Sequence, residues 1–321
     1  MPKFNQYPAA TGIEDTDILL KDTSGGTATK KATARQLADY MLSKGPVDFN
    51  YPGVDLTVKF ASEITAAGND PWAWIKSRIT AGNFTGIHVG DYIPFKATNS
   101  AQTQLYARIL GINTYKQYGD TTIGNHIDFW AGLWPTKKQI NPVNYNNGTS
   151  VSAHPWLASD AYLYANSLSG QVPSTAAANP TLAAKNYTSD GIYYYLPTAL
   201  KNVIVEKRFY LPKRYTAGSM LLDDNSSGWA NIGKIWFPTE VEVYGAPMFG
   251  GKGGYSNGGS VQYPFFAFGM NRLSFGNVLW WLLSTYSGDS GLWCTVQTGG
   301  YAYANNASNA SVAAPVCFRI S

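Results

Sequence analysis

Residues 278–321 carry the clearest pattern of apolar and polar positions in the chain. Val278 to Leu283 is a continuous apolar run of strand length, which predicts a strand buried on both faces. Residues 292–296 and 312–320 each alternate between apolar and other side chains, which predicts two half-buried strands. The segments between these strands are rich in Tyr, Ser, Asn and Gly, so we expect a small sheet that carries polar, aromatic loops.

This loop composition is typical of a recognition surface. Tyr supplies stiff contact area with few rotatable bonds, and Ser, Asn and Gly supply adaptable hydrogen bonding. Ordinary solvated loops are the alternative interpretation. We predict a solvent-facing ligand-binding patch formed by Ser284, Thr285, Tyr286, Ser287, Asp289, Ser290, Trp293, Thr295, Gln297, Tyr301, Tyr303, Asn305, Asn306, Ser308 and Asn309.

The middle of the chain contains two clear helix starts. Asp70-Pro71-Trp72 places a carboxylate cap before a proline at the first helical position, and Ser159-Asp160 begins a second helix. A third short helix is expected from Pro197 to Val203. Strands are expected at 87–95, 105–112, 125–130, 203–211, 234–237 and 241–245, with a surface excursion at 169–190 and a flexible glycine-rich loop at 250–259.

Residues 1–45 are expected to form a separate small module. Strands near 17–22 and 29–32 flank a Ser-Gly-Gly turn, and Thr33 with Gln36 has the spacing of a helix capping box. A hairpin and one helix bury little surface alone, so we expect this module to fold against other copies or a larger assembly. Residues 46–69 read as a connection with one strand at 56–60, and residues 70–321 as the main domain.

Composition and charge narrow the function classes. Charged residues make up only 14% of the chain and the net charge is +4 without a dense Lys/Arg run, which argues against nucleic-acid binding. No apolar stretch is long enough for a transmembrane helix, and no signal peptide is visible. The two cysteines, Cys294 and Cys317, differ in phase on neighbouring strands, so we expect free buried thiols.

Catalytic and metal-binding signals are weak. His126 and Asp128 form a His-x-Asp pair, but no recognisable motif places a Ser or Cys nucleophile or a third metal ligand beside them. A histidine that is hydrogen-bonded inside the domain is therefore the favoured interpretation. We predict no catalytic residue, no metal site and no cofactor.

Four short motifs lie close together near the N-terminus, within about 30 positions: 15–20 (DTDILL), 22–26 (DTSGG), 29–31 (TKK) and 36–37 (QL). On these residues the N-terminal segment resembles a segment common in bacteriophage tail-fibre and appendage proteins. In that family the segment attaches a receptor-binding subunit to the virion. The resemblance therefore implies contact with other tail proteins through residues 1–45, a homotrimer, and a location in the virion.

Residues 70–321 contain a series of ordered motifs: 89–95 (VGDYIPF), 125–128 (NHID), Trp156 with 159–160 (SD), 236–245 (WFPTEVEVYG), 263–266 (YPFF), 280–284 (WWLLS) and 315–317 (PVC). On these motifs the segment resembles a C-type-lectin-like domain family found in bacterial and phage proteins. Leu283 stands where that family usually has Arg. The resemblance implies an α+β fold with two main helices, a small antiparallel sheet and many loops.

Together the resemblances imply a phage tail receptor-binding protein that recognises a bacterial surface protein or glycan and is not an enzyme. Some relatives of this fold are diversified by retroelements that mutate adenines in C-terminal codons, and residues 284–309 resemble such a region. Two alternatives stay open. One is an enzyme like the formylglycine-generating enzymes, using Cys294 and Cys317; the other is a structural tail-tip or decoration protein. A calcium lectin is disfavoured because Glu-Pro-Asn and Gln-Pro-Asp triplets are absent.

Overall fold

The chain divides into two compact units, Met1–Tyr51 and Pro52–Ser321. The computed structural model describes residues 53–116, 122–146, 154–177, 180–212, 227–250, 259–273 and 278–321, and the backbone of two strands nearer the N-terminus. These strands, β1 (Ile18–Lys21) and β2 (Lys30–Thr33), pair antiparallel, as the sequence predicts. The helix expected after Thr33 and most of the glycine-rich loop at 250–259 lie outside the described residues.

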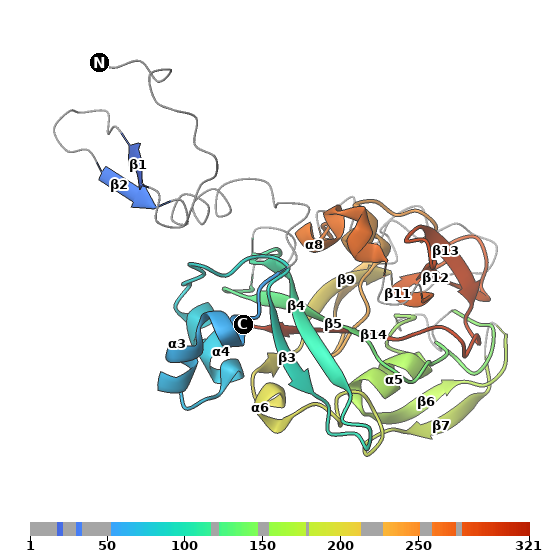
Figure 1. Ribbon diagram of the computed structural model, residues 1–321. Coiled ribbons are helices and arrows are strands. Elements are labelled where there is room, and N and C mark those ends of the chain that lie inside the picture. Colours follow the sequence, from blue (N-terminus) through green and yellow to red (C-terminus); the bar gives the residue numbers. More distant parts are fainter. Residues whose placement is uncertain are drawn as a thin grey trace. The chain divides into compact units, whose positions relative to one another are not determined.

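A five-stranded antiparallel sheet forms the centre of the second unit (Figure 1). Its strands are β3 (Tyr92–Lys96), β4 (Gln104–Ile112), β5 (Ile127–Leu133), β14 (Pro315–Ile320) and β8 (Ile204–Val205), in that order. The C-terminal strand β14 therefore lies between β5 and β8, and all six of its residues are buried. It was expected to be half-buried, but a strand inside the sheet with both faces covered has no solvated side.

A three-stranded sheet and the loops between its strands carry most of the predicted recognition residues. It contains β11 (Trp280–Thr285), β12 (Leu292–Val296) and β13 (Ala302–Asn306), with β12 in the middle. Two further antiparallel pairs are β6 (Ser169–Pro173) with β7 (Leu182–Asn186) and β9 (Arg208–Pro212) with β10 (Ser227–Asn231). The fold is therefore mixed, with antiparallel sheets and few helices, which agrees with the expected α+β class.

The two strongest helix predictions are confirmed. Helix α4 (Pro71–Thr80) begins where the Asp70 carboxylate accepts the Trp72 N–H at 2.8 Å. Helix α5 (Asp160–Asn166) begins where Ser159 Oγ accepts the Tyr162 N–H at 3.0 Å. The other helices are short: α2 (Leu56–Lys59), α3 (Ala61–Ala66), α6 (Thr198–Lys201), α7 (Glu240–Tyr244), α8 (Pro264–Ala267) and the 3₁₀ turn η2 (Gly269–Arg272).

Three strand predictions are wrong. The strand expected at 56–60 is helix α2, because Asp55 caps it by accepting the Thr57 N–H at 2.8 Å. The strand expected at 241–245 is helix α7, because Thr239 and Glu242 form a capping box. The excursion expected at 169–190 contains the β6–β7 pair, most of whose residues are exposed or half-buried, in agreement with a surface position. Residues 234–237 form no strand and contribute only an isolated bridge from Trp236 to Cys317.

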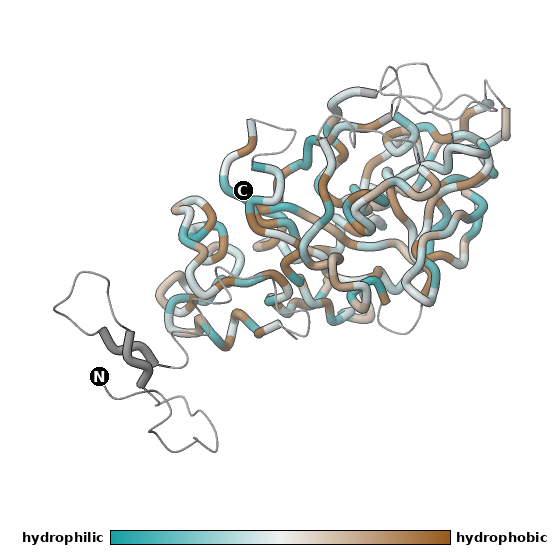
Figure 2. The backbone as a smooth tube through the Cα atoms, turned by 90° about the horizontal axis from the view of Figure 1, so that it is seen from above, coloured by the Kyte–Doolittle hydropathy of each residue, from teal (hydrophilic) through white to brown (hydrophobic). Residues whose placement is uncertain are grey.

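Aromatic packing joins the central sheet to the elements around it. Phe129 of β5 stacks on Phe318 of β14 with ring centroids 5.2 Å apart, and Trp72 of α4 meets Phe318 edge-on at 6.1 Å. Trp130 packs against Trp280 at 5.5 Å, which connects the central sheet to the three-stranded sheet. Figure 2 shows apolar and polar residues interleaved along the chain, as expected when each element contributes part of its residues to a common core.

Candidate ligand-binding surface

The middle strand of the three-stranded sheet does not face solvent. Trp293 and Thr295 are both completely buried, and the Trp293 indole N–H donates to the Leu282 carbonyl at 2.8 Å. Thr285 and Ser287 are also buried. The expectation that these four side chains belong to a solvent-facing patch is therefore wrong. Strand β12 is covered on both faces, which its alternating sequence did not indicate.

Strand β13 does present aromatic side chains to solvent. Tyr301 is 58% exposed and Tyr303 is 45% exposed. Tyr303 lies opposite Thr295 in the register, and Asn305 lies opposite Trp293, so Tyr303 and Asn305 share one face of the sheet. Tyr301 directly precedes β13, and its carbonyl accepts the Gln297 N–H at 2.9 Å, which continues the register by one more pair. Tyr301 and Tyr303 together form the core of the candidate surface.

The β11–β12 loop is ordered by contacts within the protein. The Asn146 amide donates to the main-chain carbonyls of Tyr286 at 3.2 Å, Asp289 at 2.8 Å and Leu292 at 2.7 Å. Tyr286 is half-buried against Phe249, with ring centroids 5.8 Å apart. Asp289 is exposed, while Ser284 and Ser290 are half-buried. Sequence reasoning missed Asn146, because its Asn-Asn-Gly context indicated only a turn.

The segment after β13 is held in a similar way. The Asn309 amide donates to Asn305 Oδ1 at 2.8 Å, and Ser308 Oγ donates to Asn144 Oδ1 at 2.5 Å. Asn305, Ser308 and Asn309 are partly buried, and Asn306 is exposed. Gln297, at the β12–β13 turn, is also partly buried. The candidate surface thus centres on Tyr301 and Tyr303 and has an amide-rich edge.

The chain's two cysteines are buried, free thiols, as expected. Burial raises the pKa of both, and beside Cys294 the neighbouring Glu240 carboxyl raises it further. A thiol with a raised pKa and no exposure is a poor nucleophile. Neither residue therefore has the environment expected of a catalytic cysteine.

A fully buried network of charges joins β5, β9, β14 and α7. Arg319 donates two hydrogen bonds to Asp128, from Nε to Oδ1 at 2.6 Å and from Nη2 to Oδ2 at 2.8 Å. Tyr263 also donates to Asp128, at 2.8 Å. Lys207, which precedes β9, donates to Tyr263 Oη at 3.0 Å and forms an ion pair with Glu242 of α7. The two carboxylates and two cations balance in charge.

The network sets the ionisation of its members. Burial opposes the charged form of Asp128, but the charge and hydrogen bonds of Arg319 outweigh this and lower the Asp128 pKa well below its usual value. Burial lowers the pKa of Lys207, and Glu242 and Asp128 partly oppose that shift. Aromatic rings surround the Lys207 ammonium group, with Phe209 at 4.5 Å and Trp236 at 4.9 Å. These charged groups are buried and paired with one another, so they are not accessible to a substrate.

His126 is a structural residue of the same region. Its Nε2 accepts the Tyr115 N–H at 3.2 Å, and its Nδ1 lies 3.0 Å from the Gly124 carbonyl oxygen, which fits a neutral ring that donates from Nδ1. Burial lowers the His126 pKa and so favours this neutral form. The arrangement supports the interpretation of His126 as an internally bonded histidine.

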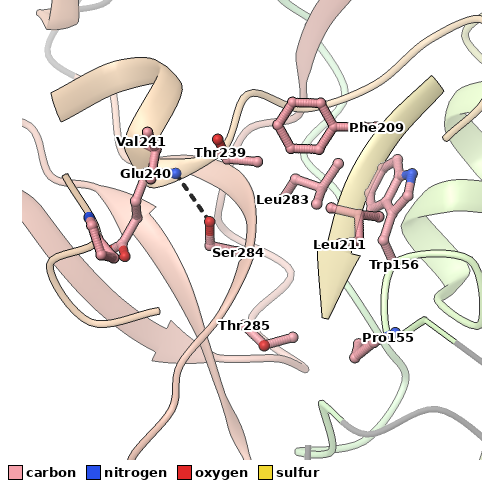
Figure 3. A pocket seen from close by; sticks show the side chains of 11 residues that line it. Pro155, Trp156, Phe209, Leu211, Thr239, Glu240, Val241, Leu283, Ser284 and Thr285 are labelled. Atoms are coloured by element: carbon pink, nitrogen blue, oxygen red, sulfur yellow. Dashed lines mark hydrogen bonds between the residues drawn. The ribbon is translucent and has the colours of Figure 1, made fainter. Parts of the chain in front are cut away.

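A pocket is lined by residues from β9, α7 and the C-terminal end of β11 (Figure 3). Ser284 Oγ accepts the Glu240 N–H at 3.0 Å, and the Glu240 carboxylate accepts the N–H groups of Met248 and Gly250 at 3.1 and 2.6 Å. Glu240 therefore holds the 248–250 turn in place. The lining residues are Pro155, Trp156, Phe209, Leu211, Thr239, Glu240, Val241, Pro247, Leu283, Ser284 and Thr285.

Comparison with known proteins adds no relative: no protein-family model, curated protein or solved structure matches this chain. Within the described ranges, no group of three or more His, Cys, Asp and Glu side chains could hold a metal ion. Nor does the described part of the chain contain a helix with the length and apolar character needed to cross a bilayer.

Proposed function

We propose that this protein is a phage tail receptor-binding protein whose second unit is a C-type-lectin-like domain. The observation that supports this most directly is the exposure of Tyr303 on strand β13 and of Tyr301 immediately before that strand. Large aromatic side chains that stay exposed on a rigid scaffold are typical of binding sites, because solvent-exposed rings gain most when a partner covers them.

The surrounding surface fits binding better than catalysis. Residues 284–309 contain one charged residue, Asp289, while hydroxyl and amide side chains are abundant. Such groups supply directional hydrogen bonds at low desolvation cost. The contacts of Asn146, Asn305 and Asn309 hold the loops in place. The loops would therefore lose little conformational entropy when a partner binds.

The first unit has the role that the tail-fibre resemblance implies, attachment to the virion. Homotrimeric assembly follows from the same resemblance. Because a single small patch binds weakly, several copies on one particle would raise the avidity by ~100-fold or more without any new contact. A bacterial surface protein or glycan is the receptor in this proposal.

Binding to bacterial cells tests the proposal. The double variant Tyr301→Ala/Tyr303→Ala should lose at least about tenfold in affinity for a strain that the wild-type chain binds, since it removes two exposed aromatic anchors. Tyr194→Ala is a matched control, because Tyr194 is as exposed as Tyr303, at 45%, but lies outside the candidate surface.

Three results would contradict the proposal. The double variant could bind as well as wild type, Tyr194→Ala could lose binding equally, or the wild-type protein could bind no strain in a broad panel. The last outcome, together with loss of particle assembly in the Tyr301→Ala/Tyr303→Ala variant, would support a structural tail component instead.

A further inference from the structure

Strand β13 is the open edge of its sheet. The strand order is β11–β12–β13, and within the described residues β13 pairs only with β12. Figure 1 shows β13 as the last strand on its side of this sheet. An edge strand leaves every second residue with its N–H and C=O directed away from the sheet.

The register identifies which residues these are. The Gln297 N–H donates to the Tyr301 carbonyl at 2.9 Å, and the Ala307 N–H donates to the Gly291 carbonyl at 2.9 Å. Positions 301, 303, 305 and 307 therefore direct their main-chain groups toward β12. By alternation, Ala302 and Ala304 direct theirs outward. The open edge ends at Asn306, whose carbonyl accepts the Asn309 N–H at 2.9 Å.

Among the residues that the structure describes, this edge shows none of the features that normally block strand addition. Proteins protect edges with Lys, Pro, bulges or a covering segment. The edge of β3 is covered in this way, since the Tyr92 N–H donates to the Val54 carbonyl at 3.0 Å. In β13 the outward positions are Ala302 and Ala304, which are small and uncharged, and the strand contains no proline.

We propose that the receptor contact on β13 is an extended polypeptide segment that adds to this sheet as a fourth strand. The inference rests on the proposed function and names the receptor class for the same surface. Outward N–H and C=O groups on alternate residues repeat about every 7 Å, which matches the repeat of another strand. Tyr301 and Tyr303 flank the added strand on one face and contact its alternate side chains.

A polypeptide fits this edge better than a glycan does. The outward groups of Ala302 and Ala304 are main-chain donors and acceptors in equal number, which is the pattern that a second backbone satisfies completely. Sugar hydroxyls are bound mainly by charged and amide side chains, and the outward positions of β13 before Asn306 carry none. Specificity comes from the side chains beside Tyr301 and Tyr303, and affinity from the main chain.

The test selects 12-residue peptides on the immobilised full chain from a random library and measures their affinity for variants. Ala304→Pro removes one outward N–H and leaves the β12 pairing intact, since proline is tolerated where an edge N–H faces solvent. It should weaken peptide binding at least about tenfold, because the ring also obstructs the incoming strand. Ala304→Ser keeps the N–H and should bind within about twofold of wild type.

Hydrogen exchange gives a second readout that needs no variant. The amides of Ala302 and Ala304 should exchange fast in the free protein and become protected when a selected peptide is bound. Unchanged exchange at both amides with peptide bound would overturn the inference even if Ala304→Pro failed to fold.

Other outcomes separate this inference from the proposed function. If Ala304→Pro keeps full binding to cells while Tyr301→Ala/Tyr303→Ala loses it, the side chains bind a receptor but strand addition is wrong. If the protein binds glycans on an array and no binding peptide can be selected, the receptor is not a polypeptide and the inference is overturned. If the wild-type protein is an oligomer and Ala304→Pro dissociates it, the edge of β13 pairs with a second copy of the chain. That result also overturns the inference.

Discussion

Removing Arg319 from the buried network should unfold the second unit more readily than any surface change. Arg319 and Asp128 are 1% and 0% exposed and share two hydrogen bonds. Arg319→Met leaves the Asp128 carboxylate buried with the Tyr263 hydroxyl and the nearby Lys207 charge as compensation. Breaking a buried pair in this way costs about 3–5 kcal/mol, because the remaining charge is desolvated and unpaired.

The penalty should depend on pH in a defined direction. In the wild type the lowered Asp128 pKa means that its stabilising contribution is present above the unfolded-state pKa and is lost only as pH falls through the folded-state pKa. In Arg319→Met, burial dominates and the Asp128 pKa rises. Protonation then relieves the buried charge, so the penalty should shrink by about 1.4 kcal/mol per pKa unit of rise as the pH falls from about 7 to about 4.

Urea unfolding followed by tryptophan fluorescence is the appropriate assay, because all ten tryptophans lie in the second unit. The control Asp128→Leu/Arg319→Met removes both charges and should recover at least about half of the lost stability. The reasoning would be refuted if Arg319→Met lowered the free energy of unfolding by less than about 1 kcal/mol, or by the same amount at about pH 7 and about pH 4.

Two further predictions concern buried side chains of the two larger sheets. Trp293→Ala should lower the free energy of unfolding by about 3–5 kcal/mol, measured by urea denaturation, because it empties a fully buried site and removes the hydrogen bond to Leu282; a loss within about 0.5 kcal/mol would mean that the ring is on the surface. Cys294 and Cys317 should both resist a thiol reagent in the native protein and react in denaturant, since burial raises their pKa; rapid native labelling of either would contradict this.

The sequence alone determined features that depend on neighbouring residues. A cap at Asp70 or Ser159 acts within one helical turn, so its signal is local and both helices begin where the pattern indicates. The same holds for the apolar run that became β11. The capping box at Thr239 was equally local, but an alternating Val-Glu-Val pattern concealed it, and helix α7 was interpreted as a strand.

Only the tertiary structure decided which side chains of the candidate surface meet solvent. Tyr303 and Thr295 are paired neighbours with similar polar character, yet one is 45% exposed and the other fully buried. The difference arises because β12 lies between two strands with both faces covered, whereas β13 is an edge. Likewise, the charged network joins Asp128 to Arg319, 191 positions later in the chain, and no local pattern encodes a pairing made by long-range strand order.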